Sequence, residues 1–331
     1  MRVHRGFSAS RSDRDGFGAA VAIGNFDGVH RGHRAVIEAA RRHAVELGTD
    51  LGVITFEPHP REVLQGMKAP ERLSPLRTKV ERLRELDVRQ LYVLPFTRSL
   101  MSMSAEAFVE DVLIGSLGVK AVVAGADFRF GHKRSGDIEL MRRIAAHHGV
   151  RVDTASTVSD SAGVISSTRI RAALAEGRVA DAGHLLGYDY EIVGRVRTGD
   201  RRGRELGFPT ANTYPLHPRT AMPANGIYAV RAALVGSQDG SHPVNDAGNS
   251  ATVWHPGAAS LGTNPTFDGR ERRLEVHLLD GMDYDLYGRR LRVAFIDRLR
   301  GEERFASIDS LIAQMNIDCD RAREILAAPA I

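Results

Sequence analysis

The first half of this chain is organised around the sequence GNFDGVHRGH at residues 24–33. An apolar run, AAVAI, precedes it at residues 19–23, and residues 34–47 after it carry apolar side chains at helical spacing. This order predicts a buried strand, a glycine-rich turn and the start of a helix. Free backbone N–H groups and the positive end of the helix dipole meet at such a junction, so an anion is favoured there.

The side chains of this turn suit a phosphate group. His30 and His33 add donors that can hold phosphate oxygens, and three glycines let a ligand approach the backbone closely. We interpret the turn as a nucleotide-phosphate site. Two alternatives stay open: His30, His33 and His59 as metal ligands, or a plain surface turn with incidental histidines. No further ligand at zinc spacing is evident, which disfavours the metal, and the strand-to-helix position disfavours the plain turn.

Length and composition limit the remaining possibilities. At 331 residues, two domains are expected, and a net charge of +4 without a basic run between aromatic residues gives no support for nucleic-acid binding. The single cysteine, Cys319, excludes an internal disulfide and is expected to be packed in a C-terminal helix. No stretch reaches the roughly 18 apolar residues of a membrane span, and no GxxxxGK[ST] phosphate loop occurs. A soluble cytoplasmic protein is therefore expected.

The first half alternates strands with helices. Further strands are predicted at residues 51–56, 90–96, 120–125 and 150–154. Helices are predicted at residues 34–47, 75–86, 104–118 and 135–148, with Ser74 as the N-cap of the second. Strands separated by single helices indicate a doubly wound parallel sheet, which binds ligands beyond the carboxyl ends of its strands. The segments EPHP and ADFRFG, at residues 57–60 and 126–131, fall at that same edge.

The pattern changes near residue 188. Short alternating runs separated by turn residues follow, at residues 191–199, 226–236, 251–255, 272–280 and 289–299. They predict a small antiparallel β-barrel, and a final helix begins near the N-cap Ser307. The expected domains are residues 1–187, an α/β domain, and residues 188–331, a β domain.

Two short segments resemble signatures of the nucleotidyltransferase superfamily, whose members transfer AMP from ATP to an acceptor with loss of pyrophosphate. The first is HxGH at residues 30–33, and the second is ISSTRIR at residues 165–171. The resemblance implies that Ser167 and Thr168 donate hydrogen bonds to the β- and γ-phosphates and that Arg171 supplies a bidentate cation. The alternative is an ordinary Ser/Thr helix cap followed by solvated arginines.

The second half contains GDRRGRELGFPTAN at residues 199–212. Thr210 and Asn212 alternate along an extended segment, so their oxygens could ligate Mg²⁺ from one face. An arginine-rich hairpin loop with a proline turn is the other interpretation. The string closely resembles the PTAN signature of riboflavin kinases. Three further segments of that family match in the same order, at residues 225–230, 261–267 and 274–280.

Together the two halves resemble the bifunctional bacterial riboflavin kinase/FAD synthetase (FMN adenylyltransferase) family across nearly the whole chain. The resemblance implies a Rossmann-like, doubly wound nucleotidyltransferase domain followed by a β-barrel riboflavin kinase domain with a C-terminal helix. It also implies two reactions: riboflavin and ATP give FMN and ADP, and FMN and a second ATP give FAD and pyrophosphate. Riboflavin, FMN, FAD and ATP are the implied small-molecule partners, with Mg²⁺, and neither nucleic acid nor membrane is expected to bind.

The resemblance also assigns the site residues. Glu275 would be the kinase base, although an exposed strand residue facing Arg273 is the alternative. His30, His33 and Arg171 would serve adenylyl transfer, and Thr210 and Asn212 would hold Mg²⁺. The implied nucleotide- and flavin-binding residues are Gly24, Phe26, Asp27, Gly28, Phe56, Pro58, Asp127, Arg129, Ser167, Thr168, Gly199, Arg204, Gly207, Tyr228 and Asn264.

Two departures from the family pattern limit this transfer. Ala126 stands where a glutamate is common, and residues 235–251 form a longer, more polar connection, so the loop geometry near the kinase site stays open. Oligomeric state also stays open. Two other functions are weighed: a nucleotidyltransferase for another phosphorylated acceptor with a non-catalytic flavin-binding barrel, and a non-catalytic flavin or nucleic-acid binder.

Overall fold

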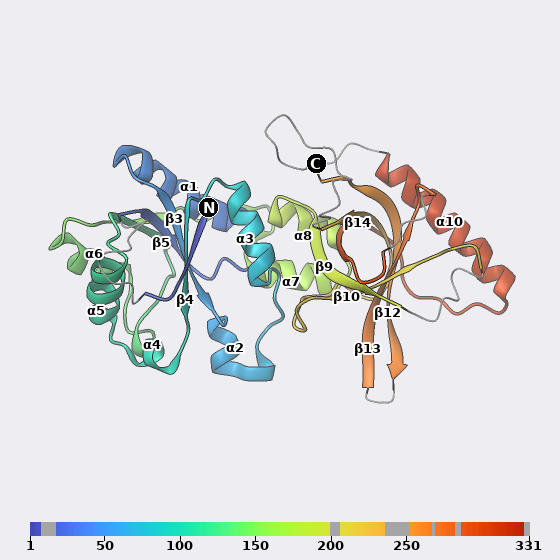
Figure 1. Ribbon diagram of the computed structural model, residues 1–331, viewed down its shortest axis with the longest axis horizontal. Helices are drawn as coiled ribbons and strands as arrows, with labels where there is room; N and C mark the ends of the chain where they lie inside the picture. Colours follow the sequence, from blue (N-terminus) through green and yellow to red (C-terminus); the bar gives the residue numbers. More distant parts are fainter. Residues whose placement is uncertain (8–17, 199–205, 236–251, 267–268, 282–285, 328–331) are drawn as a thin grey trace. The chain divides into compact units, whose positions relative to one another are not determined.

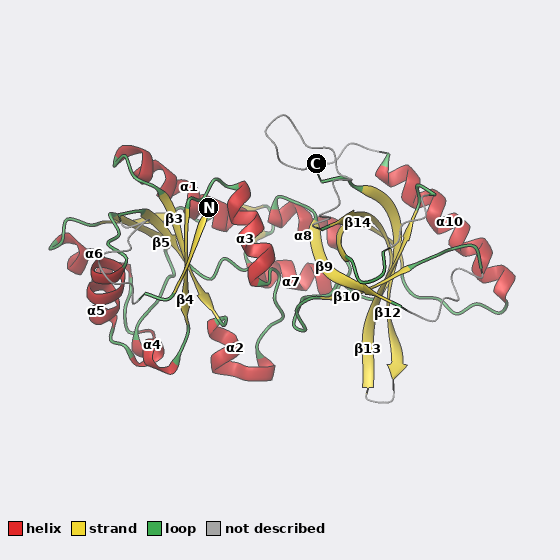
Figure 2. Ribbon diagram, in the orientation of Figure 1, coloured by secondary structure: helices red, strands yellow, loops and turns green. Residues whose placement is uncertain are grey.

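The computed structural model describes residues 1–7, 18–198, 206–235, 252–266, 269–281 and 286–327, without the side chains of 264–266 and 269–271. The chain divides into two compact units, Met1–Ser167 and Thr168–Ile331. We call them the α/β unit and the barrel unit (Figures 1 and 2).

The α/β unit is built on a six-stranded parallel sheet of order β1-β4-β3-β2-β5-β6. Its strands are β1 (Arg2–Arg5), β2 (Ala20–Ile23), β3 (Leu51–Glu57), β4 (Gln90–Pro95), β5 (Ala121–Gly125) and β6 (Arg151–Ala155). The predicted doubly wound sheet is confirmed, with the extra edge strand β1. That strand was missed because its sequence RVHR, largely exposed, has no apolar pattern.

Helices and one short hairpin complete the α/β unit. The helical segments are α1 (Arg31–Glu46), α2 (Pro60–Gln65), η1 (Gly66–Lys68), α3 (Leu76–Glu85), α4 (Arg98–Ser102), α5 (Ala105–Ala107), η2 (Phe108–Ser116), η3 (His132–Arg134) and α6 (Ile138–Ala146). The hairpin is β7 (Ser159–Asp160) with β8 (Gly163–Val164).

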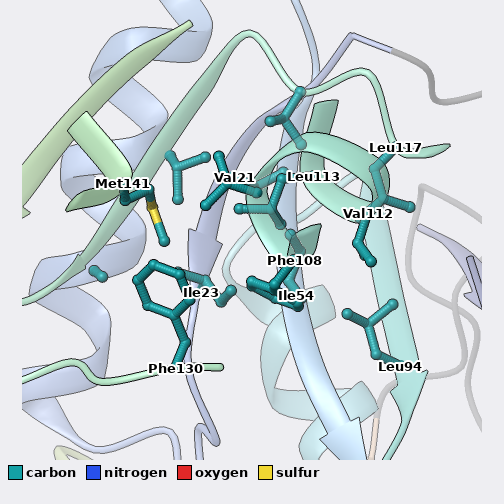
Figure 3. Packing of buried hydrophobic residues seen from close by; sticks show 14 of the residues in the cluster. Val21, Ile23, Ile54, Leu94, Phe108, Val112, Leu113, Leu117, Phe130 and Met141 are labelled. Atoms are coloured by element: carbon teal, nitrogen blue, oxygen red, sulfur yellow. The ribbon is translucent and has the colours of Figure 1, made fainter. Parts of the chain in front are cut away.

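Each face of the sheet has its own apolar core, because alternate side chains of a strand point to opposite faces. Val21 and Ile23 of β2 pack with Phe108 and Met141 from η2 and α6 (Figure 3). The alternate residues of β2, together with β3 and β5, pack against α1 and α3 on the other face. The sheet is therefore the middle of three layers.

One predicted helix cap is wrong. The N-cap residue of α3 is Pro75, and no side chain caps this helix. The Ser74 hydroxyl instead accepts a hydrogen bond from the Gly28 N–H at 2.7 Å. A tertiary partner has replaced the local one, since a serine oxygen can serve either role.

The barrel unit is a closed six-stranded antiparallel barrel of order β10-β13-β12-β11-β14-β9. Its strands are β9 (Tyr190–Arg197), β10 (Ala211–Pro215), β11 (Gly226–Leu234), β12 (His255–Thr266), β13 (Gly269–Leu278) and β14 (Arg290–Arg300). Its helices are α7 (Ser167–Ala175), which starts at the last residue of the α/β unit, α8 (Val179–Leu186) and α10 (Ile308–Leu326).

The predicted antiparallel β-barrel and the predicted C-terminal helix are both present. Ser307 caps α10, and Cys319 is buried where α10 packs on the barrel beside Phe208 and Ala258. The strand predicted at residues 251–255 is misplaced: β12 begins at His255, and residue 251 lies outside the described residues. Pairing with β13 from Gly257 to Thr266 extends β12 through small residues of low strand propensity, so tertiary pairing overrides local preference.

Candidate functional sites

The turn at residues 24–33 lies at the carboxyl end of β2. In the sheet, β2 lies between β3 and β5, so the chain leaves β2 toward β3 on one side and later returns to β5 on the other. This is the topological switch point of the sheet, where open α/β folds bind their ligands. The position agrees with the predicted edge.

The backbone of the turn is strained. Phe26, Gly28 and Val29 have φ of 48°, 91° and 39°. Glycine adopts this region freely, whereas each non-glycine residue costs about 1–3 kcal/mol there. Such a conformation persists only when surrounding contacts hold it. In this turn the contacts are hydrogen bonds and packed aromatic rings.

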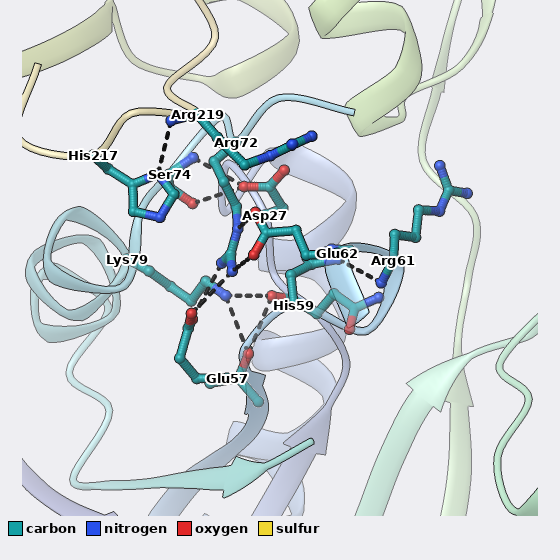
Figure 4. Close-up of polar contacts among 12 residues, drawn as sticks. Asp27, Glu57, His59, Arg61, Glu62, Arg72, Ser74, Lys79, His217 and Arg219 are labelled. Carbon is teal, nitrogen blue, oxygen red and sulfur yellow. Dashed lines mark hydrogen bonds and ion pairs between the residues drawn. The ribbon is translucent and has the colours of Figure 1, made fainter. Parts of the chain in front are cut away.

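Asp27 and Ser74 hold the centre of the turn (Figure 4). The Asp27 carboxylate accepts hydrogen bonds from the backbone N–H groups of Ser74 at 2.9 Å and Leu73 at 3.3 Å. The Ser167 hydroxyl donates to the Asp27 carbonyl at 2.9 Å. Asp27 thus orders the turn, and the ISSTRIR segment contacts it through Ser167.

His30 and His33 form a stacked pair, with ring centroids 3.6 Å apart. His30 is the N-cap residue of α1, and its Nδ1 accepts from the His33 backbone N–H at 3.3 Å. A neutral His30 ring that accepts through Nδ1 therefore carries its proton on Nε2. A Cβ at Gly32 would lie 3.1 Å from the His30 ring and 3.4 Å from the Ile165 carbonyl, so glycine allows this packing.

His33 is kept neutral. Burial, followed by the nearby His30 and Lys79, holds the pKa of His33 well below its usual value of 6.5. Its Nδ1 is buried and has no hydrogen-bond partner among the residues that the structure describes. The Phe26 ring packs against this ring in a T-shaped arrangement, at a centroid distance of 5.2 Å. The turn therefore contains an uncharged imidazole with one buried ring nitrogen that is unpartnered within the described chain.

The other predicted nucleotide-binding residues differ in how far they are buried. The Gly24 N–H donates to the Ile54 carbonyl at 3.1 Å, and Phe56 at the end of β3 is buried. Pro58 and Asp127 are exposed. Arg129 is also exposed and pairs with Asp137 at 2.9 Å.

Thr168 and Arg171 lie on α7, within the barrel unit. Thr168 is exposed, and Arg171 is half-buried. Of the three predicted ISSTRIR site residues, Ser167 is the one that belongs to the α/β unit and contacts the turn.

In the barrel unit, Asn212 of β10 is paired directly with Glu275 of β13. Directly opposed residues point to the same face of a sheet, so their side chains are neighbours. The Asn212 Oδ1 atom is buried and has no hydrogen-bond partner within the described part of the chain. Glu275 is 36% exposed, and its carboxylate lies 3.5 Å from the Arg273 guanidinium. Thr210 is half-buried immediately before β10.

Tyr228 and Gly207 are two further predicted kinase residues that the structure describes. Tyr228 is completely buried, its hydroxyl donates to the Ala224 carbonyl at 2.5 Å, and its ring packs against Phe295 in the barrel interior. Gly207 is exposed with φ of 87°. Gly199, Arg204, the side chain of Asn264 and the loop 236–251 lie outside the described residues.

Sequence reasoning missed a polar cluster behind the turn, in which Arg72 and Lys79 are buried and Glu57 and Glu62 are partly exposed (Figure 4). Arg72 is 2% exposed and pairs with Glu57 and Glu62 at 2.7–3.1 Å. Charged residues are mostly exposed in proteins, so their sequence pattern predicts a solvated face of a helix or loop. The clue that could have marked them is the long polar stretch following β3, in a sheet whose ligand edge is at that end.

Neither a metal cluster nor a membrane helix is found in the described ranges. No group of three or more His, Cys, Asp or Glu there could hold a metal, and His59 instead caps α2 through Nδ1. No helix among them is long and apolar enough to cross a membrane.

Two different protein families match the two halves of this chain. Family models match here for FAD synthetase over residues 13–169 and riboflavin kinase over residues 186–326. Curated proteins named bifunctional riboflavin kinase/FMN adenylyltransferase are similar over their full length. The Escherichia coli (strain K12) protein is 40% identical over 100% of both chains, and the Pseudomonas fluorescens protein is 39% identical over 100% of this chain and 99% of its own.

A solved structure titled macrolide-efflux protein, from Streptococcus pneumoniae, has the same fold. It superposes with a TM-score of 0.83 and 31% identity, covering 98% of this chain and 99% of that one. Its title describes that protein, whereas both family models and the curated relatives agree on flavin enzymes. This chain therefore belongs to the bifunctional riboflavin kinase/FMN adenylyltransferase family.

Proposed function

We propose that this chain makes FAD from riboflavin in two steps. The barrel unit phosphorylates riboflavin with ATP, giving FMN and ADP. The α/β unit then joins FMN to the AMP part of a second ATP and releases pyrophosphate. The matched ranges 13–169 and 186–326 support a functional boundary near residue 187, with residues 170–185 as a connection. The reactions would take place in the cytoplasm.

The kinase step rests on the pair of Asn212 and Glu275. Glu275 would accept the proton of the ribityl 5′-hydroxyl as that oxygen attacks the γ-phosphorus of ATP. Its partial exposure and its place on a rigid strand suit a base that must reach a small substrate. The neighbouring Arg273 guanidinium, 3.5 Å from this carboxylate, would restrain its orientation toward the substrate.

Asn212 and Thr210 would hold Mg²⁺ for this step. The fit rests on the Asn212 Oδ1 atom, which is a hard oxygen ligand, buried and without a hydrogen-bond partner in the described chain. When bound, the ion would neutralise the charge of the transferring phosphoryl group. The chain's own contribution is to fix the amide by the pairing of β10 with β13.

The adenylyl step requires no base, because the FMN phosphate is already ionised. The turn would bind the ATP phosphates through its backbone N–H groups and the N-terminus of α1. The Nε2 proton of His30 and the neutral His33 would donate to phosphate oxygens as charge moves to pyrophosphate. Ser167, Thr168 and Arg171 would complete the phosphate contacts.

A single timed reaction tests both steps. The full chain is incubated with riboflavin, ATP and Mg²⁺, and the flavins are separated by chromatography at intervals. FMN is expected first and FAD afterwards. If no FMN forms, the kinase assignment is wrong. If FMN accumulates without FAD, the adenylyl-transfer assignment is wrong, and supplied FMN with ATP checks that step alone.

A further inference from the structure

Lys79 of α3 is buried directly behind the turn, and the reactions above give it no role (Figure 4). Its side chain is 0% exposed. A buried ammonium group costs several kcal/mol unless polar partners compensate it, so its contacts deserve an explanation. No carboxylate is ion-paired with Lys79 in the part of the chain that the structure describes.

The partners of Lys79 are oxygens of the turn and of β3. Its Nζ donates to the Asn25 carbonyl at 2.6 Å and to the Thr55 hydroxyl at 3.2 Å. The Thr55 hydroxyl itself donates to the same Asn25 carbonyl at 3.1 Å. Two donors from two different elements therefore converge on one carbonyl.

The orientation of the Asn25 carbonyl fixes the backbone conformation of the strained part of the turn. The Asn25 carbonyl belongs to the peptide plane whose orientation sets the φ of Phe26, which is 48°. The Phe26 ring also packs against the His33 ring in a T-shaped contact. If the carbonyl were released, the backbone of Phe26 could relax from the left-handed region. The contact between the Phe26 and His33 rings would then be lost.

The carboxylates near Lys79 are held by other groups, so the ammonium charge of Lys79 acts mainly on the turn. Arg72 engages both Glu57 and Glu62. Asp27 is held by the backbone N–H groups of Leu73 and Ser74. Lys79 is one of the groups that lower the pKa of His33.

We propose that Lys79 is a positioning residue for adenylyl transfer, whose ammonium group holds the Asn25 carbonyl and places a positive charge beneath the phosphate-binding turn. The inference rests on the proposed adenylyl-transfer function of the turn. Lys79 touches no reacting atom in this role. It acts through Asn25, Phe26 and His33.

The first test compares Lys79→Met with Lys79→Arg in the full chain. Lys79→Met keeps the side-chain length but removes the charge and the donors. We expect about a 10- to 100-fold loss of kcat/KM for FAD formation from supplied FMN, as displaced catalytic geometry typically costs. Riboflavin phosphorylation by the same preparation should stay within about twofold, and Lys79→Arg should recover part of the loss.

A matched variant separates the charge from the hydrogen bond. Thr55→Val removes the second donor to the Asn25 carbonyl and leaves the lysine in place. We expect it to lose less FAD-forming activity than Lys79→Met at equal thermal stability. Equal losses in the two variants would overturn the role of the charge, and wild-type kcat/KM in a folded Lys79→Met variant would overturn the whole proposal.

The pH profile of the unmutated chain gives a readout that a merely structural role would not move. Burial lowers the pKa of Lys79 from 10.5 to about 8. FAD formation should therefore decline as pH rises through about 8, and Lys79→Arg should move that decline upward. The charged or titratable groups that influence or face Lys79 are Asp27, His33, Glu57, His59, Glu62 and Arg72.

These outcomes are separable from failure of the proposed function. If the unmutated chain makes no FAD from FMN and ATP, the function of the turn is wrong, whatever the variants do. If Lys79→Met does not fold, the pH profiles of the unmutated chain and of Lys79→Arg decide. Identical profiles would contradict the proposal, and an upward shift would support it.

Discussion

The turn of the α/β unit and the strand pair of the barrel unit differ in how their polar groups are held. In the turn, strained backbone presents N–H groups, and buried side chains behind it keep it in place. In the barrel, Asn212 and Glu275 are neighbours simply because β10 and β13 are paired in that register. The turn therefore depends on side-chain contacts from other elements, whereas the strand site depends on the backbone pairing of two strands.

The largest effect is expected from Glu275→Ala. Loss of a general base should lower FMN formation by about 10²- to 10⁴-fold. FAD formation from supplied FMN should be unchanged, because it uses the other unit. Chromatography of both reactions measures the two rates, and Glu303→Ala, another exposed glutamate of the barrel unit, is the matched control. Loss of both activities in a folded variant would break the two-site comparison.

His33→Ala should give the converse result. Removing one donor to the developing charge should lower FAD formation by about 10²- to 10³-fold, while riboflavin phosphorylation stays intact. His148→Ala, at an exposed position after α6, should have no effect on either rate. Normal FAD formation by His33→Ala would remove this histidine from the site.

Asn212→Ala tests the metal assignment. Loss of a contact to a charged group should raise the Mg²⁺ concentration needed for half-maximal kinase activity by about 10-fold or more. The Mg²⁺ dependence of FAD formation should not change. A titration of both reactions with Mg²⁺ measures this, with Asn316→Ala on the exposed side of α10 as the control. An unchanged requirement in the kinase reaction would exclude Asn212 as a ligand.

Ser74→Ala sharpens the comparison through stability. It removes the hydrogen bond from the buried Gly28 N–H to the Ser74 hydroxyl, which should cost about 0.5–1.5 kcal/mol of unfolding free energy in the α/β unit. Denaturant unfolding measures the change against Ser99→Ala at an exposed position. An equal stability of the two variants would mean that the turn is held without this hydrogen bond.

The smallest effect concerns pH and His59. Burial, partly opposed by Asp27, lowers the pKa of His59 from 6.5 to about 4. The unfolded chain therefore binds the proton more readily between these values, and stability should fall as pH drops from about 6.5 to 4, by at most about 1.4 kcal/mol per unit. His59→Asn, which keeps a capping acceptor, should flatten this slope. An unchanged slope would assign the acid sensitivity to other groups.

Local patterns predicted both architectures. Periodicity located β2 to β6, the main helices and most barrel strands, because burying one face of each element imposes those patterns. It missed β1, whose four residues form a strand through pairing with β4, and it misplaced the start of β12. The catalytic roles of His30, His33, Arg171 and Glu275 stay predictions.

The order of elements, the glycine-rich turn after β2 and the resemblance of both halves to one family could all be predicted from the sequence, since each is a property of neighbouring residues. Three contacts became evident from the three-dimensional structure alone: Ser74 accepts from Gly28, Asn212 faces Glu275, and Lys79 lies beneath the turn. These contacts join residues 46, 63 and 54 positions apart. Their geometry follows from packing of whole elements, which no local pattern encodes.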